Sequence, residues 1–393
     1  MKGIDGLKVL ALLWLCGVAL RLTILAVPAV ITDLQAELIL SGTEVGILTG
    51  LPVIIFGLFA VPGSVVIARL GIVSALGIGL IATGIGGALR GAIPSAIVLY
   101  GMTVVMAAGV AMLQVALPAA VRAWTPARIV FATAVYTNGL LFGEIFPVAL
   151  TQPLVMPLVG GRWEASFAVW SAPLLLIAVL VWSLAPRSEA TAVTIGSAWW
   201  PDWRSRLMWR IGLIAAGIMG TYFASNAFLP PYLAERGRPD LITPVLTALN
   251  VGQLPASFVL LAFANRFDRR AWPFTAFGVL ALLCVFGIAS SAGWWIVAWA
   301  AVLGFACGGA LTVCLTLPPL LGREDEVARL SAGMMSIGYG LAVLVSVFGG
   351  AAWDFGGRVV FAFVPVALGL LPLILLPRGI PFRSAAGSVV GRA

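Results

Sequence analysis

The amino-acid sequence predicts an all-α membrane protein with twelve transmembrane helices, arranged as two pseudo-symmetric six-helix bundles with both termini in the cytoplasm. Of the 393 residues, 61% are hydrophobic and only 10% are charged, whereas about 25% of the residues in a soluble domain are charged. Apolar runs long enough to cross a bilayer recur along the whole chain, and the two halves of the chain resemble each other. These observations exclude a water-soluble fold.

Each predicted span is an apolar run close to the ~20 residues that a helix needs to cross the hydrocarbon core. Glycine and proline occur inside many spans, which membrane helices tolerate when neighbouring helices satisfy the freed backbone groups. The connections are short, apart from the one between spans six and seven. In order, the spans are 8–31, 43–66, 72–92, 95–121, 128–151, 164–185, 208–231, 243–264, 273–291, 294–320, 328–351 and 359–377.

The distribution of basic residues predicts the orientation, because cytoplasmic loops are enriched in Lys and Arg. Most of the 23 basic residues fall at the two termini and in the connections that follow even-numbered spans. Both termini are therefore expected in the cytoplasm, and the regular alternation supports a count of twelve spans. The basic residues of the opposite side are Arg90, Arg162, Arg236, Arg238 and Arg358.

Matching motifs in the two halves indicate an internal duplication. Leu117-Pro118 in span four recurs as Leu317-Pro318 in span ten, and Tyr136 in span five answers Tyr339 in span eleven. Because the matches keep the same order, we predict two parallel bundles related by an axis along the membrane normal. The expected domains are an N-terminal bundle over 1–186, a cytoplasmic linker over 187–207 and a C-terminal bundle over 208–393.

The composition also excludes several kinds of chemistry. The chain has no histidine, which rules out a histidine-based proton relay, a Ser-His triad and a histidine-ligated metal. Each of its four cysteines lies in an apolar run and none belongs to a CxxC motif, so we expect small buried residues and not disulfides or metal ligands. The basic residues are scattered among short loops. We therefore expect no catalytic residue, no metal, no cofactor and no nucleic-acid partner.

Short motifs along both halves carry a resemblance to a known family. They are Leu20-Arg21-Leu22, Leu51-Pro52-Val53, Phe56-Gly57-Leu58-Phe59, Leu117-Pro118-Ala119, Tyr136-Thr137, Pro153-Leu154, Gly161-Arg162-Trp163, Gly308-Gly309-Ala310, Ala328-Arg329-Leu330-Ser331 and Gly338-Tyr339. Together they resemble the major facilitator superfamily, and more specifically its cyanate and nitroimidazole transporter branch. The resemblance implies a two-bundle transporter that works by alternating access. The branch commonly has an asparagine where this chain has Leu20.

The resemblance also implies that two cytoplasmic loops take part in gating. The loop between spans two and three keeps Arg69 and Gly71 but has Ala68 where the superfamily usually carries an acid. The corresponding loop of the second half keeps Asp268 and Arg269. We expect these four matching residues to act in conformational gating, with an incomplete charge latch in the first half.

Arg21 is a basic residue inside a span, about half-way along 8–31. A cation near mid-membrane costs several kcal/mol unless it is paired or faces water. Its planar fork suits a small carboxylate or another planar anion. Two interpretations follow: a substrate contact within a cavity, or a permanent ion pair that locks two helices. We favour the substrate contact, because intramembrane ionisable residues are functional by default.

Glu144 is the acidic residue that lies deep within a predicted span. Spans one and five both run outward, so Arg21 and Glu144 should reach comparable depths and could pair directly, which would cancel two costly charges. The alternative is that Glu144 takes up and releases a proton during each cycle and couples transport to the proton gradient. This second interpretation depends on sequence position alone.

Uncharged polar residues at middle depths either bind substrate or form hydrogen bonds between helices. We predict substrate contacts for six of them and favour helix packing for Asn138 and Asn250, which lie off the centre of their spans. The six predicted substrate-binding residues, besides Arg21, are Gln114, Tyr136, Tyr222, Asn226, Gln253 and Tyr339.

The function predicted from these features is secondary active transport of a small polar, anionic solute across the bacterial inner membrane, with protons as a candidate coupling ion. The alternative is an exporter of nitroaromatic or other drug-like compounds, in which Arg21 and Glu144 neutralise each other. A membrane-embedded enzyme would need a catalytic or cofactor motif that the spans lack. The expected partners are the substrate, protons and membrane lipid, and the expected state is a monomer.

Overall fold

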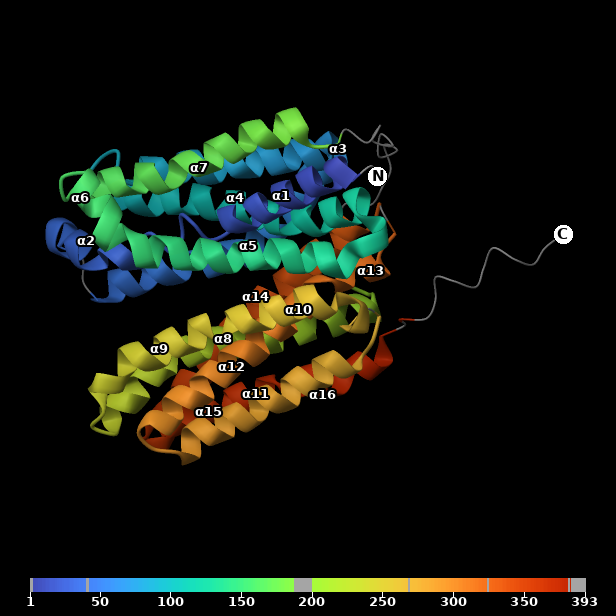
Figure 1. Cartoon of the computed structure of the whole chain (residues 1–393). Coiled ribbons are helices and arrows are strands. Elements are labelled where there is room, and N and C mark those ends of the chain that lie inside the picture. The colour runs from blue at the N-terminus through green and yellow to red at the C-terminus, as the bar shows by residue number, and fades with distance from the viewer. Residues whose placement is uncertain are drawn as a thin grey trace. The chain divides into compact units, whose positions relative to one another are not determined.

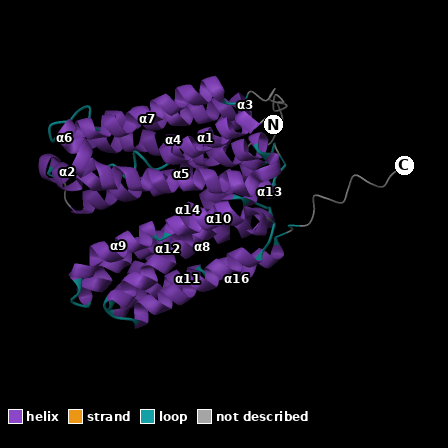
Figure 2. Ribbon diagram, viewed as in Figure 1, coloured by secondary structure: helices purple, strands orange, loops and turns teal. Residues whose placement is uncertain are grey.

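The computed structural model describes residues 3–39, 42–186, 200–267, 269–323, 325–380 and 382, and throughout these residues the regular structure is helical (Figure 2). Ten helices among them are long and apolar enough to cross a membrane by length and composition. One of these, Gly50–Leu89, covers most of the predicted spans 43–66 and 72–92, and the shorter apolar helix Gly6–Ala19 overlaps the predicted span 8–31. The chain is therefore a multi-pass helical protein, and the count of twelve spans stays a prediction.

The chain divides into two compact units. The first unit consists of Met1–Asp202 and Glu324–Tyr339, and the second consists of Trp203–Arg323 and Gly340–Ala393. The first boundary falls within the predicted linker, most of which lies outside the described residues. The segment Glu324–Tyr339 joins the first unit, although the sequence had assigned it to the C-terminal bundle. The predicted domain boundaries thus stay a prediction.

In the first unit, α1 packs against α5 and α7, while α3 packs against α4 and α7 (Figure 1). Because α1 and α5 touch directly, residues of the first and fifth predicted spans can meet. The helices of this unit are α1 (Gly3–Ala19), α2 (Ile31–Leu38), α3 (Gly42–Leu89), α4 (Ala96–Trp124), α5 (Ile129–Leu150), α6 (Met156–Leu158), α7 (Trp163–Leu184) and the first part of α14 (Val327–Gly356).

In the second unit, α12 packs against α9, α10 and α11, and α8 packs against α12, α15 and α16. Helix α14 continues into this unit from Gly340 onward. The helices of the second unit are α8 (Arg206–Glu235), α9 (Ile242–Val251), α10 (Gln253–Phe267), α11 (Trp272–Ser290), α12 (Trp294–Leu315), α13 (Leu317–Leu321), α15 (Phe363–Gly369) and α16 (Leu371–Leu375).

The first predicted span is not one continuous helix. Helix α1 ends at Ala19, and turns follow from residue 20 to residue 27 before a short 3₁₀ helix at Pro28–Val30. Several backbone amides here donate to the carbonyl three residues earlier, as in a 3₁₀ turn. The Leu20 amide, for example, donates to the Gly17 carbonyl at 3.1 Å. Pro28 contributes to the break, because proline has no N–H to donate to the preceding turn. Arg21 therefore lies on an irregular segment.

The predicted second and third spans are joined by a sharp bend instead of a loop. The two halves of α3 meet at Gly71, whose backbone has φ of 82° and ψ of 170°. This positive φ is readily adopted only by glycine. Arg69 and Gly71, the first pair of predicted gating residues, therefore lie at the bend.

Large apolar side chains are exposed in both units. Among them, Ile97 and Leu158 belong to the first unit, and Phe286 and Trp295 belong to the second. A soluble monomer rarely exposes such extensive apolar surface, so these side chains are expected to face lipid. The four cysteines are, by contrast, buried and free of disulfides.

Candidate functional site

The contact between α1 and α5 places the candidate site in the first unit. Gly139 and Gly143 lie on α5 where it touches α1, and a Cβ atom at either position would collide with the backbone carbonyl of Trp14 or Val18. Small residues allow membrane helices to approach this closely. Gly143 precedes Glu144, and Val18 lies one turn before Arg21, so this approach brings the two charged side chains together.

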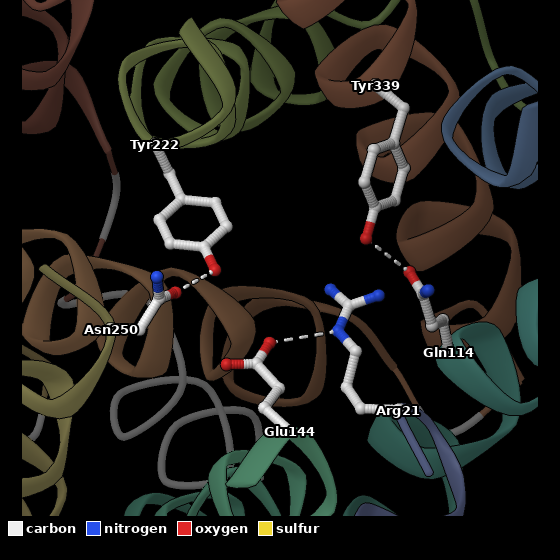
Figure 3. Close-up of polar contacts among 6 residues, drawn as sticks. All are labelled: Arg21, Gln114, Glu144, Tyr222, Asn250 and Tyr339. Carbon is white, nitrogen blue, oxygen red and sulfur yellow. Dashed lines mark hydrogen bonds and ion pairs between the residues drawn. The ribbon is translucent and has the colours of Figure 1, made fainter. Parts of the chain in front are cut away.

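Arg21 and Glu144 form an ion pair at the end of this interface. Nε of Arg21 donates to Oε1 of Glu144 at 3.2 Å, as Figure 3 shows. The side chains retain 12% and 14% of their surface exposed. In a pair this far buried, each charge stabilises the other, because removing one side chain would leave the opposite charge buried and unpaired. The residual exposure distinguishes the pair from one sealed within the helix packing.

An aromatic and amide group continues from Arg21 within the same unit. The Arg21 guanidinium lies 5.7 Å from the centre of the Phe56 ring, and that ring lies 5.3 Å from the ring of Tyr339. The Tyr339 hydroxyl donates to Oε1 of Gln114 at 2.9 Å (Figure 3). Two of the predicted substrate-binding residues, Gln114 and Tyr339, thus bind each other in a group that includes Arg21.

The chemistry available to this group follows from its charges. The Arg21 guanidinium offers several donors in one plane, an arrangement that suits carboxylates and other planar anions. Protonation of Glu144 would weaken its attraction to Arg21, because a neutral carboxyl group no longer balances the guanidinium charge. The group therefore combines one guanidinium, one carboxylate, one amide and one hydroxyl.

A second polar group lies in the second unit and links α8 to α9. The Tyr222 hydroxyl donates to Oδ1 of Asn250 at 2.6 Å (Figure 3), and Nδ2 of Asn250 lies 3.3 Å from Oδ1 of Asn226. The amide of Asn226 donates to the backbone carbonyl of Tyr222 at 2.9 Å. Tyr222 and Asn226 were predicted as substrate contacts and Asn250 as a packing residue, and the structure joins all three.

The remaining predicted polar residues, Tyr136, Asn138 and Gln253, are buried. Tyr136 is buried on α5, next to Gly17 of α1. Asn138 accepts a hydrogen bond from the Trp14 indole at 3.0 Å, which agrees with a helix-packing role. Gln253 is buried in the second unit, and its Nε2 has no hydrogen-bond partner among the described residues.

The predicted gating residues are only partly described. Arg69 is exposed beside the bend at Gly71, and Arg269 is exposed with an unusual positive φ of 50°. Asp268 lies outside the described residues. The gating role of all four residues stays a prediction.

Phe56 is a contact of Arg21 that the choice of site residues from the sequence missed. Its motif Phe56-Gly57-Leu58-Phe59 was noted only for its resemblance to a family. A phenylalanine in an apolar span gives no signal of its own, because most such residues face lipid or the core. Only the position of Arg21 over the ring identifies it.

Ten apolar helices of membrane-spanning length among the described residues define a multi-pass membrane protein. A family model described as Major Facilitator Superfamily matches residues 13–243, which is more than half of the chain. The chain belongs to the Major Facilitator Superfamily.

Individual relatives agree with this assignment. The "Uncharacterized transporter YycB" of Bacillus subtilis is 26% identical over 378 residues, which cover 95% of this chain and 90% of that protein. The "Cyanate transport protein CynX" of Escherichia coli is 25% identical over 256 residues, covering 62% and 63%. The structure of the proton:xylose symporter XylE superposes with a TM-score of 0.73 at 15% identity, covering 97% of both chains. That last likeness shows the fold alone.

Proposed function

We propose that this chain is a secondary active transporter that moves a small polar anion across the bacterial inner membrane by alternating access. In this proposal the chain crosses the membrane twelve times, in two bundles, with both termini in the cytoplasm. Membership of the Major Facilitator Superfamily supports solute transport. The similarity to a protein named for cyanate transport supports a small anion as the substrate.

The observation that carries the anionic substrate is the ion pair of Arg21. The Arg21 side chain remains partly exposed, and the side chains that continue from it, Phe56, Tyr339 and Gln114, are uncharged. A small planar anion would take the place of Glu144 and keep Arg21 neutralised. Gln114, whose Nε2 has no hydrogen-bond partner among the described residues, offers a nearby donor for the same anion.

Thermal unfolding of the purified protein with added cyanate, formate or nitrate tests the proposal. A ligand at one hundred times its Kd stabilises the folded protein by about 2.7 kcal/mol, which a shift in Tm would reveal. We expect this shift in the wild type and in the control Arg128→Ala, where an exposed arginine is removed. We expect it to disappear in Arg21→Ala. Wild-type affinity in Arg21→Ala would contradict the proposal.

A second candidate function is export of nitroaromatic or other neutral drug-like compounds. It is favoured if the ion pair of Arg21 and Glu144 is permanent. If Glu144 neutralises Arg21 permanently, a neutral compound would contact the neighbouring rings of Phe56 and Tyr339, which are buried in this structure. A neutral nitroimidazole would then raise the Tm of the wild type, and small anions would not compete with it. Competition by cyanate would favour the anion transporter.

A further inference from the structure

Arg90 is a second buried cation in the first unit, and neither proposed function uses it. The sequence placed it near the end of a span among the residues of the outer side, but the structure buries it directly after α3 with 1% of its surface exposed. Among the described residues, no carboxylate is within ion-pair distance of it. A buried guanidinium without a carboxylate is costly, so its other contacts should explain why it is there.

Those contacts are two backbone carbonyls and an aromatic ring. Nη2 of Arg90 donates to the carbonyl of Thr23 at 2.6 Å, and Nε donates to the carbonyl of Gly87 at 3.4 Å. The guanidinium carbon lies 4.4 Å from the centre of the Phe167 ring of α7. Arg90 therefore connects α3 and α7 to the irregular segment that follows α1.

The Thr23 carbonyl lacks the backbone hydrogen bond that a continuous helix would give it, because the first span is interrupted here. In a regular helix it would accept from the amide of Val27, but that amide donates to Ile24 at 3.4 Å. A buried carbonyl without a donor is unfavourable, and Arg90 supplies the donor. The Thr23 side chain is enclosed as well, because a Cβ atom on Gly87 would lie 3.0 Å from its Cγ2 and 2.5 Å from Oγ of Ser171.

We propose that Arg90 is a positioning residue for Arg21: by holding the Thr23 carbonyl, it fixes the turns of residues 20–27 in the form that presents Arg21 to Glu144. Thr23 is only two residues from Arg21, and the Arg21 carbonyl itself accepts the amides of Ile24 and Leu25 within these turns. The effect on anion affinity depends on the proposed function. The effect on the backbone does not.

Hydrogen exchange measured by mass spectrometry separates these two effects. In Arg90→Met, we expect amide exchange in peptides spanning 20–27 to accelerate about tenfold, as local protection falls when a stabilising contact is lost. Peptides from α5 should be unchanged. Arg90→Lys should lie between Arg90→Met and the wild type, because lysine can still donate to the Thr23 carbonyl. The control Arg162→Met, which removes an exposed arginine, should behave as the wild type.

Cyanate affinity of the same variants completes the test. We expect it to fall about tenfold in Arg90→Met and less in Arg90→Lys, corresponding to about 1.4 kcal/mol for the tenfold change. Wild-type exchange at 20–27 in folded Arg90→Met would overturn the proposal, and so would fast exchange with unchanged affinity. If the wild type binds no anion, the proposed function fails, while the exchange rates still decide the backbone role.

A further variant keeps the proposal falsifiable if Arg90→Met does not fold. Gly87→Ala retains the charge but pushes on the Thr23 side chain. We expect faster exchange at 20–27 in Gly87→Ala, and unchanged exchange would count against the coupling of α3 to this segment.

Discussion

Among individual residues, Arg21 and Glu144 matter most, because each neutralises the charge of the other. Breaking a buried ion pair by removing one partner costs about 3–5 kcal/mol, because the other charge stays behind uncompensated. An exchange of partners, from the Glu144 carboxylate to a substrate carboxylate or cyanate, avoids this cost. The ion pair is therefore suited to a cycle in which the pair opens only when an anion or a proton is available.

The proton-coupled form of this cycle predicts the behaviour of Glu144→Gln. Glutamine cannot gain or lose a proton, so stimulation of cyanate uptake by an imposed pH gradient should disappear in proteoliposomes. Exchange of external for internal cyanate should persist, because Arg21 remains available. The matched control is Asp354→Asn, which alters an exposed carboxylate of α14. Undiminished gradient stimulation in Glu144→Gln would defeat proton coupling.

At the scale of helices, the contact of α1 with α5 is the element that positions the ion pair. Backbones touch at Gly139 and Gly143, so the charged side chains that follow are placed by main-chain packing and not by flexible side chains. Glycine is needed at the bend for a different reason. No atom would contact a Cβ on Gly71, but its positive φ favours glycine.

Gly143→Ala should therefore destabilise the protein, although alanine is the better helix former. Overpacking of a tight interface costs about 1–3 kcal/mol, and here the new Cβ would meet the carbonyl of Val18. The control Gly101→Ala lies in α4, where a Cβ meets nothing within 4 Å, and it should be neutral or stabilising by up to about 1 kcal/mol. Thermal unfolding in detergent measures both, and equal Tm values would refute the packing argument.

On the scale of the whole molecule, the apolar composition and the positions of basic residues carry most of the prediction. They predicted a multi-pass helical protein, because a helix satisfies its own backbone groups in lipid and the apolar runs have the length that a spanning helix needs. The superfamily was predicted from the resemblance of the short motifs in both halves. The finer assignments, twelve spans and cytoplasmic termini, depend on the positive-inside rule.

The orientation predicts which loops face the outside. Arg128 and Arg162 are both exposed, and the basic-residue distribution assigns Arg128 to the cytoplasmic side and Arg162 to the outer side. In intact cells, a membrane-impermeant maleimide should label Arg162→Cys but not Arg128→Cys, which should react only after permeabilisation. The reverse pattern would invert the proposed topology.

Tertiary detail was harder to predict than the spans. The sequence placed Arg21 and Glu144 at similar depths, and the structure pairs them. It did not predict the hydrogen bond of Tyr339 to Gln114, since residues so far apart in sequence are joined only by packing. Pro28 indicated that the first span could be interrupted. Membrane helices often tolerate proline, however, so the sequence did not show that the helix ends at Ala19.

The burial of all four cysteines has a practical consequence. Cys16, Cys284, Cys307 and Cys314 lie within the helix packing, where thiol reagents dissolved in water have little access. The natural chain should therefore give a low labelling background, and single reporter thiols can be introduced at exposed positions without first removing the native ones. Spin labels or fluorophores on such thiols would let distances be followed through a transport cycle in an otherwise unaltered protein.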